Sequence, residues 1–143
     1  MLRAVMLMLC AASCLAAQPA PEAIKKELKS FQGTWKLVGG QDGTGKPYDE
    51  ETLKNMVMIV DGNKFTIKDK GADSIVGTFT IDPTKKIKTI DIAVTKPIDT
   101  KMLGIYQSEG DTRKSCFADP GKDRPDGFRK NAGFTMFEWK RVK

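Results

Sequence analysis

The chain contains no histidine among its 143 residues and only three cysteines. Histidine is the commonest metal ligand and the commonest general base, so its absence removes the usual zinc and acid–base sites. The sequence also offers no pairing of a nucleophile with a base and no cluster with metal-ligand spacing. We therefore expect no catalytic residues, no metal and no cofactor, and an enzyme is the least favoured class.

Cysteine is scarce in a way that restricts the fold. Cys10 and Cys14 fall within an apolar N-terminal segment, which leaves Cys116 as the only thiol in the rest of the chain. A single thiol cannot form an intrachain disulfide, so the fold has to rely on a packed core. A lone cysteine is usually a buried small hydrophobe, and we expect this for Cys116; the alternative is a reactive thiol.

Neither sign of charge dominates the sequence. The 24 Lys and Arg residues are offset by 18 Asp and Glu residues, which gives a net charge of +6. The cations are scattered among acids, without a long basic run or interleaved aromatic residues. We therefore expect no nucleic-acid partner and interpret the charges as a solvated surface.

The only strongly apolar run lies at the N-terminus. Residues 1–17 are predicted to be a signal peptide, with Arg3 as the positive region, residues 5–15 as the apolar region and small residues before the cleavage point. This predicts export to the periplasm or the extracellular space, since the run is too short to span a bilayer. In the alternative interpretation, residues 11–14 resemble a lipoprotein cleavage site, and a lipid on Cys14 would tether the protein to a membrane.

A spacer and a short amphipathic helix are predicted over residues 18–32. Ile24, Leu28 and Phe31 recur at helical spacing, with charged residues on the other faces. We expect this helix to lie against the outside of the following domain or to close one of its ends. Residues 56–60 are apolar on both faces, so their outer side needs a cover, and we expect the same helix to provide it.

About eight strand-like runs, separated by turn-forming residues, follow within residues 33–143, which form one domain. Alternation directs Phe65 and Ile67, and later Phe79 and Ile81, to one face. Short connections without intervening helices favour an all-β barrel or sandwich. Because closure removes exposed strand edges, we predict a small eight-stranded antiparallel up-and-down barrel with a short N-terminal helix.

The two ends of the domain carry residues suited to closing such a barrel. Gly33 and Trp35 lie in the first run and Arg141 lies in the last. If these runs pair, Trp35 would plug the base of the barrel and the Arg141 guanidinium would stack on the indole. The alternative is that Trp35 is an ordinary core aromatic and Arg141 is solvated.

These closure residues resemble those of the lipocalin-like β-barrels. A longer set of positions resembles an uncharacterised family of secreted domains from planctomycete-type bacteria, and comprises residues 31–35, 82–86, 90–91, 103–106, 110–111, 116, 120–122 and 124–125. The resemblance implies a lipocalin-like fold and export, with no established activity and no catalytic residues to transfer. Residues 134–139 are more aromatic than the aliphatic run expected there.

A barrel interior predicts ligand binding. We expect a hydrophobic or amphipathic small molecule in the interior, with Trp35 at the base and a lining of Phe65, Phe79, Ile90, Ile92, Phe137 and Trp139. Tyr106, Cys116 and Arg124 would add a phenol, a thiol and a cation if they met at one mouth. In the alternative, Cys116 packs in the core, Tyr106 anchors a strand end and Arg124 pairs with a nearby aspartate in its own loop.

The bulky interior residues could instead fill the barrel completely. In that case the chain would act through its rim loops, as an interaction or inhibitor module for an envelope protein. We expect a monomer in either case.

Overall fold

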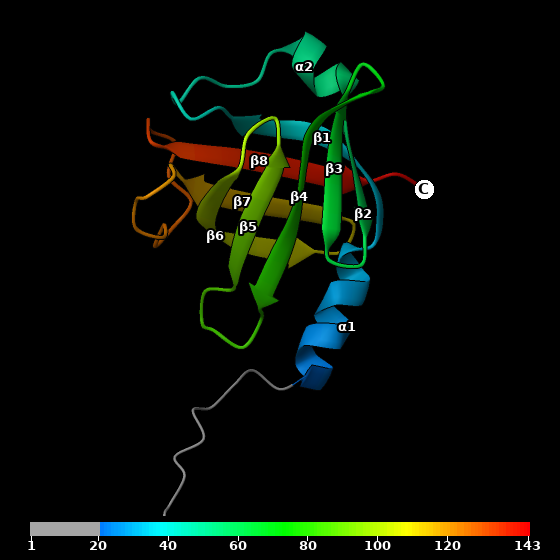
Figure 1. Cartoon of the computed structure of the whole chain (residues 1–143), viewed down its shortest axis with the longest axis vertical. Helices are drawn as coiled ribbons and strands as arrows, with labels where there is room; N and C mark the ends of the chain where they lie inside the picture. Colours follow the sequence, from blue (N-terminus) through cyan, green and yellow to red (C-terminus); the bar gives the residue numbers. More distant parts are fainter. Residues whose placement is uncertain (1–20) are drawn as a thin grey trace, which may run out of the picture.

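Eight antiparallel strands, each hydrogen-bonded to the next, form a closed barrel in the computed structural model, which describes residues 21–143 (Figure 1). The predicted signal peptide, Cys14 and the start of the predicted spacer lie outside the described residues. The strands are β1 (Gly33–Gln41), β2 (Met56–Asp61), β3 (Lys64–Asp69), β4 (Ala72–Asp82), β5 (Thr89–Lys96), β6 (Thr100–Glu109), β7 (Thr112–Ala118) and β8 (Phe134–Arg141).

Two short helices lie at opposite ends of this barrel (Figure 1). Helix α1 (Pro21–Phe31) leads into β1, and α2 (Glu50–Asn55) lies in the connection from β1 to β2. The Asp49 carboxylate caps α2 by accepting a hydrogen bond from the Thr52 backbone N–H at 2.8 Å. We refer to these ends of the barrel as the α1 end and the α2 end.

The pairing of β1 with β8 closes the barrel and confirms the predicted strand order. Trp35 lies directly opposite Arg141 in this pair, and Leu37 lies opposite Trp139. The register shifts between Leu37 and Gly39, which marks a bulge in β1. Because the first and last strands pair with each other, neither leaves an unpaired edge.

The alternating apolar residues face the interior, as predicted. Phe65 and Ile67 of β3 and Phe79 and Ile81 of β4 are all buried in one core cluster. Trp35 is only 1% exposed and lies in the same cluster. Burial of these side chains supplies the main favourable free energy of folding, since no disulfide contributes within residues 21–143.

The prediction that α1 covers the outer side of residues 56–60 is wrong. Ile59 on that side remains 39% exposed. Helix α1 instead inserts Phe31 into the barrel end, where its ring stacks on Phe79 with centroids 5.4 Å apart. Phe31 is 2% exposed there, so this position removes nearly its whole side chain from water.

A second, smaller apolar cluster lies on the outer face of β6, β7 and β8. Ile105, Cys116 and Met136 are buried together beneath Phe128 and Phe134. Phe128 belongs to the connection between β7 and β8, so that loop covers this part of the sheet. No helix within residues 21–143 is long and apolar enough to cross a membrane.

Candidate ligand-binding cavity

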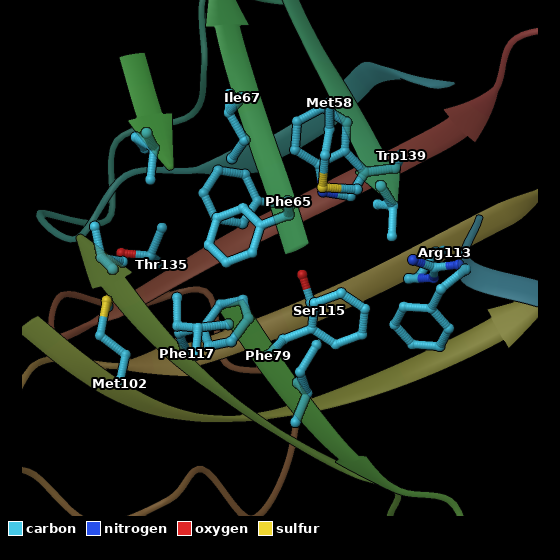
Figure 2. Close-up of a pocket in the computed structure, with 17 residues that line it drawn as sticks. Met58, Phe65, Ile67, Phe79, Met102, Arg113, Ser115, Phe117, Thr135 and Trp139 are labelled. Carbon is cyan, nitrogen blue, oxygen red and sulfur yellow. The ribbon is translucent and has the colours of Figure 1, made fainter. Parts of the chain in front are cut away.

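A cavity of about 230 Å³ lies inside the barrel. Side chains from α1 and seven of the strands surround it, and Figure 2 shows them converging from all sides. Fourteen of the seventeen lining residues are apolar, and the other three are Arg113, Ser115 and Thr135. The lining residues are Phe31, Met58, Val60, Phe65, Ile67, Ile75, Phe79, Ile90, Ile92, Val94, Met102, Arg113, Ser115, Phe117, Thr135, Phe137 and Trp139.

The α1 end of the cavity is closed by stacked rings and cations around Trp35. The Trp35 indole N–H donates a hydrogen bond to the Phe31 carbonyl at 2.9 Å. The Arg141 guanidinium lies over the indole, with Cζ 4.3 Å from the ring centroid. It also donates from Nη2 to the Ser30 carbonyl at 2.6 Å and from Nη1 to the Gln32 carbonyl. Arg141 thus ties the end of β8 to the segment between α1 and β1.

Arg113 is a second cation at this end, and sequence reasoning missed it. Its side chain points inward from β7 and is 5% exposed. The guanidinium Cζ lies 3.4 Å from the Phe31 ring centroid and 4.2 Å from that of Trp35. Nη2 donates to the Ser30 carbonyl at 3.1 Å, whereas Nε is buried without a partner.

The burial of Arg113 has an electrostatic consequence. Desolvation, and then the nearby charge of Arg141, lower the pKa of Arg113 to about 9. The side chain therefore remains protonated at neutral pH and keeps a positive charge next to an apolar space. The alternation of Arg113, Ser115 and Phe117 along β7 was the available signal, because an inward Phe117 requires an inward Arg113.

A carboxylate of α1 fastens the helix to the barrel. Glu27 Oε1 accepts hydrogen bonds from Lys88 Nζ at 2.9 Å and from the Tyr106 hydroxyl at 3.0 Å. Burial, followed by the charge of Glu27 and the hydrogen bond to it, raises the pKa of Tyr106 well above its usual range. Tyr106 packs edge-on against Phe31, with centroids 5.1 Å apart, and does not line the cavity.

The α2 end is less tightly covered. Ile75, Met102 and Thr135 line the cavity, are partly exposed, and lie near the strand ends that face away from α1. Tyr48, in the connection after β1, stacks on Phe137 with centroids 5.9 Å apart. Desolvation raises the pKa of Tyr48 above its usual range. The α2 end is therefore the more open of the two ends of the cavity.

Two inner-face glycines make room for the aromatic lining. A Cβ atom on Gly104 would lie 2.5 Å from the Phe117 ring. A Cβ atom on Gly77 would lie 3.0 Å from the Phe65 ring and 2.4 Å from the Ala93 carbonyl oxygen. Both rings therefore lie across a glycine of a neighbouring strand, which a side chain there would prevent.

The structure places all six of the predicted lining residues around the cavity and Trp35 outside it, at the base. Ligand contact by these residues stays a prediction. The residues are Phe65, Phe79, Ile90, Ile92, Phe137 and Trp139.

The second predicted group, Tyr106, Cys116 and Arg124, does not converge. Cys116 pairs with Ile105 across β6 and β7, so it shares the outer face with Ile105, whereas Tyr106 is turned to the inside. Successive residues of a strand point to opposite faces, which separates these side chains. Burial raises the pKa of the Cys116 thiol, as expected for a packed cysteine.

Arg124 lies outside the barrel and pairs with Asp91 of β5. Its Nη1 atom is 2.5 Å from Asp91 Oδ1 and donates to the Gly104 carbonyl at 2.8 Å. The expected partner in its own loop was therefore wrong. The loop folds back over the outer face of β5 and β6, where a carboxylate and a free carbonyl satisfy the guanidinium together.

Within residues 21–143, no group of three or more His, Cys, Asp or Glu side chains is placed to hold a metal ion. No family model, curated protein or solved structure matches this chain.

Proposed function

We propose that this chain binds a small hydrophobic or amphipathic molecule inside the barrel. The observation that carries the proposal is the cavity of about 230 Å³ with its almost wholly apolar lining. Apolar cavities of about 150 Å³ in other proteins stay dry and bind molecules such as benzene. By that scale, this cavity suits a molecule of about nine non-hydrogen atoms.

The geometry of the two ends supports binding from one side. Trp35 and Phe31 close the α1 end, whereas partly exposed Ile75, Met102 and Thr135 border the α2 end. A ligand entering at the α2 end would displace little ordered structure and would move its own apolar surface from water onto apolar walls. Removal of apolar surface from water is the main driving force for binding in such a pocket.

A completely filled barrel acting on an envelope protein through its rim loops is less well supported, because the interior leaves space that its bulky residues do not occupy. Membership of a lipocalin-like secreted family, export through the N-terminal leader, a monomeric state and the absence of catalysis belong to the same proposal. They rest on the sequence features described above.

Binding of a neutral apolar dye tests the proposal. We expect 1-aminonaphthalene, a polarity-sensitive dye whose size is close to that of the cavity, to gain fluorescence on titration and to saturate at one molecule per chain. Thr135→Trp should weaken dye binding at least about tenfold, because the indole would occupy the lining at the α2 end.

The matched control for this experiment is Thr66→Trp. Thr66 lies on β3 between the inward-facing Phe65 and Ile67, so its side chain faces outward and the same substitution leaves the cavity open. Failure of the native protein to bind the dye, or equal losses in both variants, would contradict binding in the cavity. Extraction of the purified protein followed by mass spectrometry would identify a copurified ligand.

A further inference from the structure

The charge of the cavity wall points to a feature of the ligand. Arg113 is the only charged residue among the seventeen that line the cavity, and no carboxylate is among them. We propose, on the basis of the proposed function, that the ligand is a medium-chain or aryl carboxylic acid whose carboxylate binds Arg113. The apolar body of such an acid would then extend toward the α2 end.

The guanidinium of Arg113 retains unused hydrogen-bonding capacity. It is 5% exposed, its Nε has no partner, and Nη2 donates to a single backbone carbonyl, that of Ser30. A buried donor without a partner is costly, and a cation without a neighbouring carboxylate more so. The planar donors of an arginine match the two oxygens of a carboxylate.

No carboxylate within residues 21–143 forms an ion pair with Arg113. A second cation, Arg141, lies over the same Trp35 ring, so two guanidinium groups occupy the α1 end. The charge of Glu27 favours protonated Arg113, but its carboxylate is already shared between Lys88 and Tyr106. Asp111 interacts with Arg141 and Lys143 rather than with Arg113. The closed end of the cavity is therefore electropositive, which favours an anionic group there.

The position of the charge also suits an amphipathic ligand. Figure 2 shows the Arg113 guanidinium at one side of the cavity and the Ser115 hydroxyl directed into the space between the aromatic rings. These two residues are the polar part of the wall near the α1 end, and apolar side chains form most of the remainder. A carboxylate at Arg113 would thus place its hydrocarbon among Phe65, Phe79 and Phe117.

Displacement of 1-aminonaphthalene from the native protein by three eight-carbon compounds tests this inference. Octanoate, octanol and octylamine differ in the charge and hydrogen bonding of the head group, and the octanoate tail is one methylene shorter, which by itself would favour octanol. A charge-assisted hydrogen bond to Arg113 predicts that octanoate binds about tenfold to a hundredfold more tightly than octanol. Octylamine should bind most weakly, because its ammonium would face two guanidinium groups.

Arg113→Gln should abolish the preference for octanoate over octanol, whereas Arg113→Lys should keep part of it. The control is Arg124→Gln, since that arginine lies outside the barrel and pairs with Asp91. We expect the control to retain the full preference. If Arg113→Gln fails to fold, the relative affinities of the three compounds for the native protein still test whether the cavity prefers a carboxylate.

The outcomes separate this inference from the proposed function. Equal affinities for octanoate and octanol, or a preference that survives in folded Arg113→Gln, would overturn the carboxylate site and leave binding in the cavity intact. Dye binding that none of the three compounds displaces would also overturn it. If the native protein does not bind the dye at all, the proposed function itself is wrong.

Discussion

The two ends of the barrel are built from the same alternating strands but differ in how they are sealed. At the α1 end, Phe31 and Trp35 are almost fully buried and two guanidinium groups lie over the Trp35 ring. At the α2 end, apolar residues such as Ile75 and Met102 stay partly exposed beside the cavity. The difference shows that strand alternation builds the wall, while helix α1 and the large side chains near the strand ends decide which mouth is closed.

The two ends of the barrel should also contribute differently to the stability of the fold and to ligand access. The helix, the stacked rings and the backbone hydrogen bonds of Arg141 join α1 to both β1 and β8 at the closed end. Helix α2 packs against β1 and β3 beside the other mouth. We therefore expect substitutions at the closed end to cost stability and those at the α2 end to change access to the cavity.

The largest expected effect is that of Trp35→Ala at the closed end. Removing a fully buried Trp should lower the free energy of unfolding by about 3–5 kcal/mol. Met102→Ala, which enlarges a space that already exists at the α2 end, should cost only about 1 kcal/mol. Urea unfolding followed by circular dichroism measures both. Equal losses of unfolding free energy in the two variants would show that the two ends contribute equally to stability.

The wall between the two ends should tolerate less change than the loops. Gly104→Ala should lower the free energy of unfolding by about 1–3 kcal/mol, because the added methyl group would overlap the Phe117 ring. Gly127→Ala is the matched control: nothing lies within 4 Å of a Cβ atom there, so its effect should stay below about 0.5 kcal/mol. A neutral Gly104→Ala in the same unfolding assay would mean that Phe117 can move aside.

The two tyrosines offer a smaller and sharper comparison, because Tyr106 lies toward the closed end and Tyr48 at the α2 end. Burial raises the pKa of both in the folded state. The unfolded chain then loses these protons first, so the stability is complete below about pH 10 and falls as the pH rises above it.

Each tyrosine should contribute a slope of up to about 1.4 kcal/mol per pH unit above pH 10. Tyr106→Phe and Tyr48→Phe should each flatten the fall of unfolding free energy between pH 10 and 11.5, measured by urea titration. The two effects should be similar, because the folded pKa of each tyrosine lies above this range and the unfolded pKa is the same for both. An unchanged slope in the double variant would show that other groups control the alkaline transition.

Much of the fold followed from local pattern. The alternation of Phe65 with Ile67 and of Phe79 with Ile81 gave the correct inner faces, and the Trp35–Arg141 pair marked the strands that meet. Alternation did not identify the inner faces of β6 and β7. Both faces of β6 carry apolar residues, and both faces of β7 mix polar and apolar residues. There the outer cover by Phe128, in the connection between β7 and β8, and by Phe134, at the start of β8, makes burial of Cys116 favourable.

The candidate site was harder to predict than the fold. A charged residue in a strand is usually solvated, so alternation with Ser115 and Phe117 was the only local sign that Arg113 faces inward. Its position becomes acceptable because Phe31 and Trp35, far away in the sequence, stack on the guanidinium and because the Ser30 carbonyl accepts from it. Likewise Arg124 found its partner, Asp91, on a strand rather than in its own loop.

The sequence by itself determined the number of strands, their inner faces on β3 to β5 and the pair of strands that closes the barrel, since these depend on period-two patterning and on the need to remove sheet edges. Trp35 and Arg141 also marked the end that is plugged. Only the tertiary structure decided how much interior space remains and which cation borders it. Those properties depend on side chains from all parts of the chain packing together, because a cavity is the volume that their combined shapes leave unfilled.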